Sequence, residues 1–163
     1  VLSAHGIVAD ALREKSKEGM RGEMSVKLDP SGNWRHIIGG GPRLIKDRQI
    51  DVSADAEQFK KDIKNGRAAR TAIGVTDQGK ILLVAADGRN RNGGDDDSNK
   101  VLLTSIGMTL EELAAFMNAQ GCTDAMNFDG GSSTTMVLNG MVVNNPVKGE
   151  ESKVSNAILV RKK

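Results

Sequence analysis

Hydrophobic residues in this chain form short runs that are separated by glycine and polar turns. Residues 71–76 and 80–86 are two such runs, and Asp77-Gln-Gly79 joins them, which predicts a β-hairpin. A second hairpin is predicted over residues 137–143, because Asn139-Gly140 is the dipeptide most typical of a two-residue turn between strands. Further strands are expected at residues 23–28, from the turn at 29–32 to Ile38, at 43–50, in the apolar run before Asp129, and at 155–160.

Three other segments have helical patterns. Residues 7–18 stop at Gly19, and residues 53–64 stop at Asn65-Gly66. The third segment begins with the capping box Thr109-Leu-Glu-Glu112 and stops at Gly121. Hairpins mixed with a few helices, without repeated βα units, predict an α+β fold with a mixed, mainly antiparallel sheet and a few packed helices. Because the 163 residues contain no internal repeat and no linker, a single domain over residues 1–163 is expected.

The richest candidate chemistry follows the apolar run that ends at Phe128. Asp129 stands at the end of this expected strand, and two glycines and four hydroxyl residues come next. A strand end holds a carboxylate rigidly, and Gly130 and Gly131 let backbone N–H groups approach a ligand. The hydroxyl groups of Ser132 to Thr135 suit sugar hydroxyls or phosphate oxygens. A polar turn in which Asp129 caps its own loop fits the same residues equally well.

Three more segments combine an apolar run with glycine and a charged or hydroxyl residue. They are Gly39-Gly40-Gly41 before Pro42, Arg70-Thr71 at the start of a strand, and Asp87-Gly88-Arg89 at the end of another. Loops at strand ends are common places for binding sites, so two carboxylates and two arginines are candidates to converge. The glycine run does not have the spacing of a Rossmann or P-loop motif, and Pro42 opposes a helix at that point.

Five motifs in the same order resemble those of the phosphodiester glycosidase family. They are IGGGPRLI at residues 38–45, RTAIG at 70–74, DGR at 87–89, GMTLEELAAFM at 107–117 and NFDGGSSTTM at 127–136. The resemblance runs from about Val1 to Val160. Residues 1–6 are similar to the middle of a family domain, so the chain is expected to be the C-terminal portion of that domain.

The resemblance implies hydrolysis of a sugar-1-phosphodiester, with α-linked N-acetylglucosamine 1-phosphate as the expected sugar side. It would release free sugar and a phosphomonoester. Asp129 is the expected nucleophile or general base, and Asp87 its partner or a positioning group. Arg70, Arg89 and the backbone of Gly39, Gly40 and Gly41 are expected to bind the phosphate. The expected substrate-binding residues are His5, Thr71, Asn127, Gly130, Gly131, Ser132, Ser133 and Asn145.

Two departures from the family pattern affect this site. Ser132 stands where the family usually has a third glycine, which we expect to be tolerated. The family usually has Glu-Arg before its last strand, whereas this chain has Glu151-Ser152-Lys153. Lys153 could replace the missing arginine as a point charge, although lysine does not reproduce the bidentate geometry of arginine.

Composition excludes several classes of partner and cofactor. With one Trp, three Phe, no Tyr and a net charge of +2, the chain offers neither stacking platforms nor a basic surface for nucleic acid. No apolar run is long enough for a membrane span. Cys122 has no second cysteine for a disulfide. We expect no cofactor and no metal site. Asp95-Asp96-Asp97 could attract Ca²⁺, but this run has no later bidentate glutamate, so a solvated insert is the preferred interpretation.

Other interpretations remain open from the residues. A carbohydrate- or phosphate-binding module would keep the pocket but would not turn over a substrate. An envelope or phage assembly protein would need neither a pocket nor catalysis. By resemblance only, a secreted, periplasmic or cell-envelope location is expected. If upstream strands are missing, an unpaired sheet edge should pair with the missing N-terminal fragment or with a second copy as a homodimer.

Overall fold

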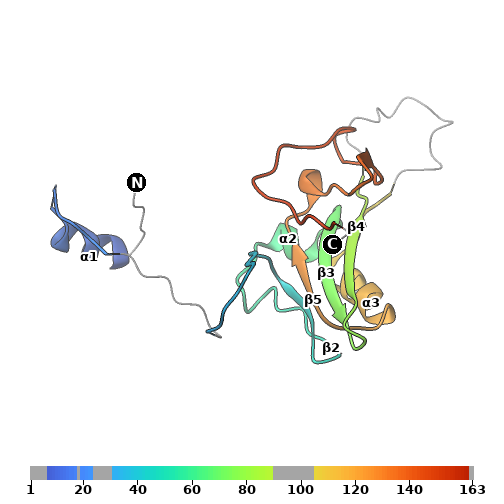
Figure 1. The fold of residues 1–163 in the computed structure, drawn as a ribbon, viewed down its shortest axis with the longest axis horizontal. Helices are drawn as coiled ribbons and strands as arrows, with labels where there is room; N and C mark the ends of the chain where they lie inside the picture. The colour runs from blue at the N-terminus through green and yellow to red at the C-terminus, as the bar shows by residue number, and fades with distance from the viewer. Residues whose placement is uncertain (1–6, 18, 24–30, 90–104, 162–163) are drawn as a thin grey trace. The chain divides into compact units, whose positions relative to one another are not determined.

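The structure, a computed structural model, describes residues 7–17, 19–23, 31–89 and 105–161 (Figure 1). The chain divides into two compact units, residues 1–37 and 38–163. In the first unit, α1 (Ile7–Lys15) confirms the helix predicted at residues 7–18 and ends at Lys15. The predicted strand at 23–28 lies outside the described residues except for Glu23. The prediction of a strand from the turn at 29–32 to Ile38 is wrong, because residues 33–38 are exposed and have no strand partner in the described chain.

The second unit is built on a five-stranded sheet with the order β2-β1-β5-β3-β4. Its strands are β1 (Arg43–Lys46), β2 (Gln49–Ile50), β3 (Arg70–Thr76), β4 (Ile81–Ala86) and β5 (Cys122–Phe128). Each pairing between neighbours is antiparallel, and Thr71 pairs with both Ala85 and Phe128. The sheet with a few helices confirms the predicted α+β class, and β3–β4 is the hairpin predicted over residues 71–86.

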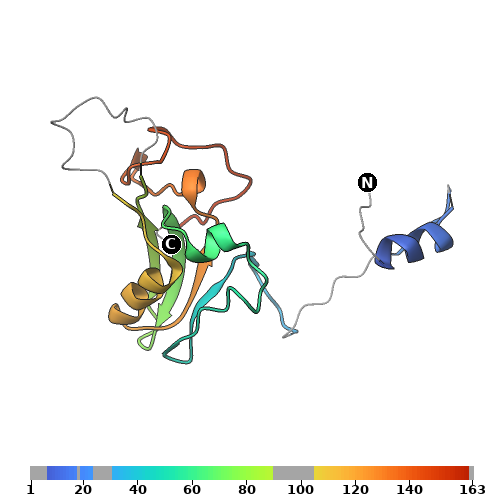
Figure 2. The ribbon, with the colours of Figure 1, turned by 180° about the vertical axis from the view of Figure 1, so that it is seen from behind.

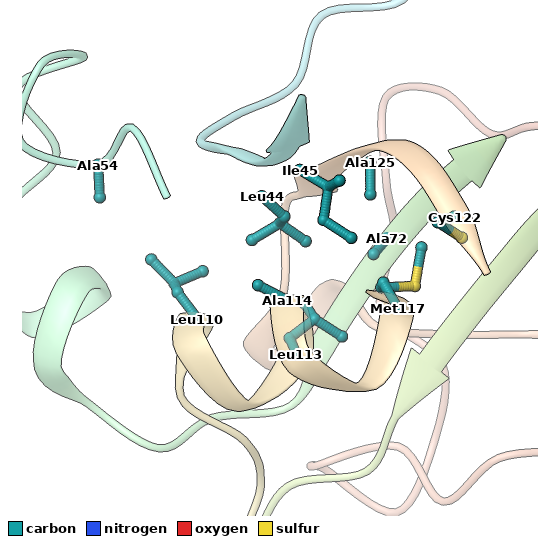
Figure 3. Close-up of a cluster of buried hydrophobic side chains, with 10 residues drawn as sticks. All are labelled: Leu44, Ile45, Ala54, Ala72, Leu110, Leu113, Ala114, Met117, Cys122 and Ala125. Carbon is teal, nitrogen blue, oxygen red and sulfur yellow. The ribbon is translucent and has the colours of Figure 1, made fainter. Parts of the chain in front are cut away.

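Helix α3 (Leu110–Ala119) packs on one face of this sheet against β1 and β5 (Figures 1 and 2). Both bonds of the predicted capping box form: Thr109 N donates to Glu112 Oε2 at 3.0 Å, and Glu112 N donates to Thr109 Oγ1 at 3.2 Å. Figure 3 shows the resulting core, with the inward side chains of α3 against those of the sheet. Its members are Leu44, Ile45, Ala54, Ala72, Leu110, Leu113, Ala114, Met117, Cys122 and Ala125.

Gly74 on β3 makes the close approach of α3 possible. A Cβ at this position would lie 2.6 Å from Cys122 Sγ and 2.7 Å from Met117 Cε. The helix and the two central strands therefore meet at a point where no side chain fits on β3. This contact fixes the height of α3 above the sheet and, with it, the position of Met108 and Thr109 ahead of the helix.

Three predicted elements differ from the structure. The strand predicted at 43–50 is a tight hairpin, because Asp47 and Arg48 take positive φ angles of 49° and 69° and reverse the chain. The helix predicted at 53–64 is reduced to α2 (Lys61–Asn65), and Gln58, with φ at 58°, separates it from the turns before it. Residues 155–160 form no strand and are exposed, because no described strand lies beside them.

The ends of three strands meet at one end of the sheet. Since β5 runs antiparallel to β3, its last residue Phe128 lies beside Thr71, and Arg70 pairs with Ala86 at the end of β4. Figures 1 and 2 show α2 and the short 3-10 helix η1 (Gly131–Ser133) near this end. The hairpin of β6 (Val137–Leu138) and β7 (Met141–Val142) follows η1 and confirms the predicted turn at residues 139–140. Motifs far apart in the sequence are thereby brought together.

Candidate active site

Asn127 joins the glycine-rich loop to the end of β5. Its Nδ2 donates to Gly41 O at 2.9 Å and to Phe128 O at 2.7 Å, and the main chain adds a bond from Gly41 N to Asn127 O at 2.7 Å. The residue is 4% exposed, and its Oδ1 is buried without a partner in the described part of the chain. Asn127 therefore fixes the loop through its donors and keeps one acceptor unused.

The glycine loop lies too close to its neighbours for side chains. A Cβ on Gly40 would lie 2.6 Å from Phe128 Cδ1, and one on Gly41 would lie 2.7 Å from Glu57 Oε2. Gly41 also has a φ of 159°, and the Gly41–Pro42 peptide bond is cis. By contrast, a Cβ on Gly39 would meet nothing within 4 Å. Two of the three glycines are thus required by packing.

The turn after Asp129 rests on Ala69. Gly131 N donates to Ala69 O at 2.8 Å, and a Cβ on Gly130 would lie 2.6 Å from that same oxygen. Asp129 is exposed, and its Oδ1 accepts from Gly130 N at 3.0 Å. The buried Thr134 accepts a hydrogen bond from Thr71 Oγ1 at 3.2 Å. The carboxylate of Asp129 therefore faces solvent from a turn that β3 supports.

Arg70 is 4% exposed and uses three of its N–H groups inside the fold. Nε donates to Met108 O at 3.0 Å, and Nη2 donates to Ile63 O at 3.1 Å and Gly66 O at 2.6 Å. Burial lowers the pKa of the Arg70 guanidinium, and the nearby Glu111 carboxylate opposes that shift. Arg70 therefore connects β3 to the end of α2 and to the residue that precedes the α3 cap.

Asp87 is half-buried and holds the segment after β7. Its Oδ1 accepts from Asn145 N at 2.9 Å and from Asn144 Nδ2 at 3.1 Å. Asn144 Oδ1 in turn accepts from Met136 N at 2.8 Å, and Ser105 Oγ donates to the Asp87 carbonyl. Asp87 is thus engaged with the loop around residues 144–145.

Two neighbouring pockets open at this end of the sheet. The first, which we call the Asp129 pocket, has a volume of about 540 Å³. Its walls are Gly39, Gly40, Gly41, Phe59, Asp62, Ile63, Ala68, Ala69, Arg70, Asn127, Phe128, Asp129, Gly130 and Gly131. It presents two exposed carboxylates, Asp62 and Asp129, over a floor that includes the buried Asn127.

The second, which we call the Arg89 pocket, has a volume of about 810 Å³. Its walls are Arg67, Ala68, Ala69, Arg89, Ile106, Gly131, Ser132, Val147 and Lys148. Ala68, Ala69 and Gly131 line both pockets. One wall therefore separates a space with two exposed carboxylates and the buried Arg70 from a space whose described charged side chains are cationic.

The predicted site residues divide into two groups. Those that line a pocket are Gly39, Gly40, Gly41, Arg70, Arg89, Asn127, Asp129, Gly130, Gly131 and Ser132. Those that line neither are Thr71, Asp87, Ser133 and Asn145. His5 and the acidic run at residues 95–97 lie outside the described residues. Among residues 7–17, 19–23, 31–89 and 105–161, no group of three or more His, Cys, Asp or Glu could hold a metal ion.

Sequence reasoning missed three charged residues that line the pockets, Asp62, Arg67 and Lys148. Asp62 lies in the first turn of α2, and Arg67 follows the C-cap residue Gly66. Only the closeness of Arg67 to the RTAIG motif could have drawn attention to it. Lys148 lies just after the Asn144-Asn145 segment that Asp87 holds. No sequence motif marks it.

This antiparallel α+β fold has counterparts among solved structures. A hypothetical protein from Synechocystis is 34% identical, with a TM-score of 0.53 over 68% of this chain and 18% of that chain. The zebrafish N-acetylglucosamine-1-phosphodiester alpha-N-acetylglucosaminidase catalytic domain, auto-inhibited by its pro-peptide, is 27% identical. Its TM-score is 0.52 over 67% of this chain and 34% of that chain.

The chain belongs to the phosphodiester glycosidase family, whose model matches residues 6–161. This confirms the resemblance seen in the five motifs. The N-acetylglucosamine-1-phosphodiester alpha-N-acetylglucosaminidase of Homo sapiens is 34% identical over 129 residues, which cover 73% of this chain. Those residues are 22% of the human protein, so the chain spans about a fifth of the length of that relative. In the described residues, no helix is long and apolar enough to cross a membrane.

Proposed function

We propose that this chain carries the catalytic site of a phosphodiester glycosidase that hydrolyses a sugar-1-phosphodiester to free sugar and a phosphomonoester. The observation that supports this most directly is the wall shared by the two pockets at Ala68, Ala69 and Gly131. A substrate that spans this wall would place a neutral sugar beside carboxylates and an anionic phosphate beside cations. Family membership and the names of the relatives support the same reaction.

The sugar is proposed to occupy the Asp129 pocket. Asp129 is exposed at the end of a rigid strand, as a nucleophile or general base at the anomeric carbon requires. The unpartnered Oδ1 of Asn127 is suited to accept from a sugar hydroxyl or from the N–H of an N-acetyl group. The close approach of the Gly40 and Gly41 backbone to Phe128 and Phe59 completes a narrow wall. The sugar that we propose is α-linked N-acetylglucosamine, as the names of the relatives suggest.

The leaving group explains why charge stabilisation matters more than protonation in this proposal. A phosphomonoester has a second pKa of about 6, so it leaves far more easily than an alcohol. A strong general acid is therefore less necessary than groups that stabilise the negative charge on the phosphate. Arg89 is proposed to serve this role from the Arg89 pocket.

Asp87 and Arg70 are proposed to act as positioning residues. Asp87 holds Asn144 and Asn145, which precede Val147 and Lys148 in the wall of the Arg89 pocket. Arg70 connects α2, β3 and the start of α3 through three carbonyl oxygens around the Asp129 pocket. Asp62, the second carboxylate in that pocket, is the proposed partner of Asp129.

Release of free N-acetylglucosamine from a synthetic N-acetylglucosamine-1-phosphodiester tests the proposal. We expect the wild-type chain to release sugar, Asp129→Asn to lose at least about 100-fold of that rate, and the fold to be unchanged. Asp77→Asn is the matched control, because Asp77 is exposed beside Arg48, outside both pockets. No release by a folded wild type would contradict catalysis by this chain. Equal rates for Asp129→Asn and wild type would remove Asp129 from the mechanism.

Location and partners beyond the substrate stay predictions. We propose a secreted, periplasmic or cell-envelope protein from family membership. Strands β2 and β4 are the two edges of the sheet in the described residues, and either could pair with another strand. Light scattering of the purified chain would detect a homodimer. Addition of an N-terminal fragment of the family domain would test the other partner.

A further inference from the structure

Helix α2 forms part of the wall of the Asp129 pocket, but it does not belong to the hydrophobic core. Asp62 and Ile63 of this helix line the pocket, beside Phe59 just before it. None of the helix residues from Lys61 to Asn65 is buried. Phe59, by contrast, packs against the core. This wall therefore joins a residue that the core fixes to a segment that the core does not hold.

The helix has little stability of its own. It contains five residues, far fewer than the roughly 12–15 that an isolated helix needs in water. Its N-cap residue, Lys60, makes no side-chain capping bond, because a lysine side chain has no acceptor. The C-cap residue, Gly66, is extended, with φ of −87° and ψ of 144°, so the left-handed turn that often closes a helix is not formed there. Contacts from outside the helix must therefore keep α2 in place.

Arg70 supplies the main contact of this kind. Its Nη2 donates to Ile63 O at 3.1 Å and to Gly66 O at 2.6 Å, so one buried guanidinium binds two carbonyl oxygens of the segment. Hydrogen bonds from a charged donor are stronger than neutral ones. Lys64 adds an ion pair with Asp55, whose side chain is 89% exposed, and an exposed pair contributes little. The position of α2 therefore depends on Arg70.

Fixed residues on both sides define the extent of the segment. Phe59 packs against the core before it. After it, Ala68 forms a β-bridge with Met108 through hydrogen bonds of 3.2 and 3.0 Å. Residues 60–66 lie between these two points. They can move away from the pocket together when the two bonds to Arg70 break, and the sheet stays intact.

We propose that residues 60–66 form a lid over the Asp129 pocket and that the two hydrogen bonds from Arg70 hold this lid closed. Opening breaks these bonds but exposes no residue of the core cluster, so the lid opens far more often than the domain unfolds. Closure places Asp62 and Ile63 against a ligand in the pocket. The identity of that ligand as a sugar rests on the proposed function, whereas the motion of the lid does not.

Hydrogen exchange of the full chain, followed by NMR, tests the lid directly. The amides of Ile63, Lys64 and Gly66 are bonded within the segment, and those of the central strand β3 report unfolding of the whole sheet. We expect the amides of residues 60–66 to exchange at least about 100-fold faster than those of β3. Low concentrations of denaturant should not change the rate of the segment, because opening exposes little surface. Exchange of both regions through one global unfolding would overturn the lid.

Substitution of the N-cap residue changes the lid in a predicted direction. Lys60→Ser places a side-chain acceptor at the N-cap, so exchange of residues 60–66 should slow about fivefold. Lys60→Ala is the matched control, because it removes the same lysine without providing a cap, and it should exchange at the wild-type rate. A folding defect would speed exchange, so slower exchange identifies a more stable closed lid. Equal rates in the two variants would overturn the proposal.

Replacement of Arg70 tests the other side of the same equilibrium. A lysine cannot donate to both Ile63 O and Gly66 O with the geometry of a guanidinium. In Arg70→Lys we expect exchange of residues 60–66 to become at least about tenfold faster, and still faster than that of β3. That difference separates release of the lid from a loss of global stability. An unchanged rate for the segment would show that Arg70 does not hold it closed.

A ligand distinguishes failure of the lid from failure of the proposed function. N-acetylglucosamine at about ten times its dissociation constant, measured by calorimetry, should slow exchange of residues 60–66 about tenfold, because it binds only the closed state. Unchanged exchange with sugar bound would overturn the lid and leave the proposed function to the sugar-release assay. If calorimetry detects no sugar binding while the variants at Lys60 and Arg70 behave as expected, the lid is supported and the proposed sugar site is contradicted.

Discussion

Asn145 donates a main-chain hydrogen bond of 2.9 Å to Asp87 Oδ1, across 58 residues of sequence. Asn144 Nδ2 donates to the same oxygen at 3.1 Å. This carboxylate therefore attaches the loop after β7 to the end of β4. The sequence led us to expect a catalytic or positioning role for Asp87, and these contacts favour positioning.

Replacement of Asp87 distinguishes the two roles. Asp87→Ala leaves two donors without their acceptor, so we expect a loss of about 1–3 kcal/mol in the free energy of unfolding. Asp87→Asn keeps an oxygen acceptor and should recover most of that stability and most of the rate of sugar release. Chemical denaturation and the sugar-release assay measure both quantities. A stable Asp87→Asn protein that releases no sugar would instead assign catalysis to the carboxylate.

The glycine loop permits a comparison between adjacent residues. A Cβ on Gly40 would lie 2.6 Å from the ring of Phe128 and 2.9 Å from Met126 Cε, whereas a Cβ on Gly39 would meet nothing within 4 Å. We expect Gly40→Ala to lower the free energy of unfolding by about 1–3 kcal/mol and to reduce sugar release, since Phe128 lines the Asp129 pocket. Gly39→Ala should stay within about 1 kcal/mol of wild type. Similar losses in both variants would show that the loop requires glycine for flexibility and not for space.

Local signals predicted the elements that depend on neighbours in the sequence. The capping box at Thr109 and the stop at Gly121 located α3, and Asn139-Gly140 located the β6–β7 hairpin. The hairpin between β1 and β2 was missed, because its turn places Asp47 and Arg48 at positive φ without a glycine to signal it. Backbone conformations of this kind depend on the contacts of the folded chain.

The sequence predicted the site residues that belong to motifs, but not those that come together only when the chain folds. The run around Asp129 and the loop at Gly39 to Gly41 were identified as candidates, and they line one pocket. Arg67 and Lys148 lie 81 positions apart in the numbering, and only the fold brings them to one space. Neither periodicity nor a turn signal predicts that two side chains so far apart in the sequence line the same pocket.

Replacement of Arg70 by lysine is expected to destabilise the fold. A lysine cannot donate to the carbonyl oxygens of Met108, Ile63 and Gly66 with the geometry of a guanidinium. We expect Arg70→Lys to lower the free energy of unfolding by about 2–4 kcal/mol, because buried carbonyls lose their donors. Arg48→Lys, in an exposed ion pair with Asp77, should change stability by less than about 0.5 kcal/mol. Unchanged stability with a raised KM in Arg70→Lys would favour direct phosphate binding, as expected from the sequence.

Asn127→Asp tests the buried amide that joins the glycine loop to β5. The substitution removes both Nδ2 donors and directs a carboxylate at Gly41 O and Phe128 O, which are themselves acceptors. Burial and these two oxygens should raise the pKa of the new carboxyl in the folded state above its unfolded value of about 3.9. The folded state then binds more protons, so the stability of this variant should fall as pH rises from about 4 through the raised pKa. Asn139→Asp, at the exposed β6–β7 turn, is the control and should show no such slope. Denaturation at a series of pH values measures both variants, and a flat profile for Asn127→Asp would contradict the assignment of Asn127 as the buried donor to both carbonyls.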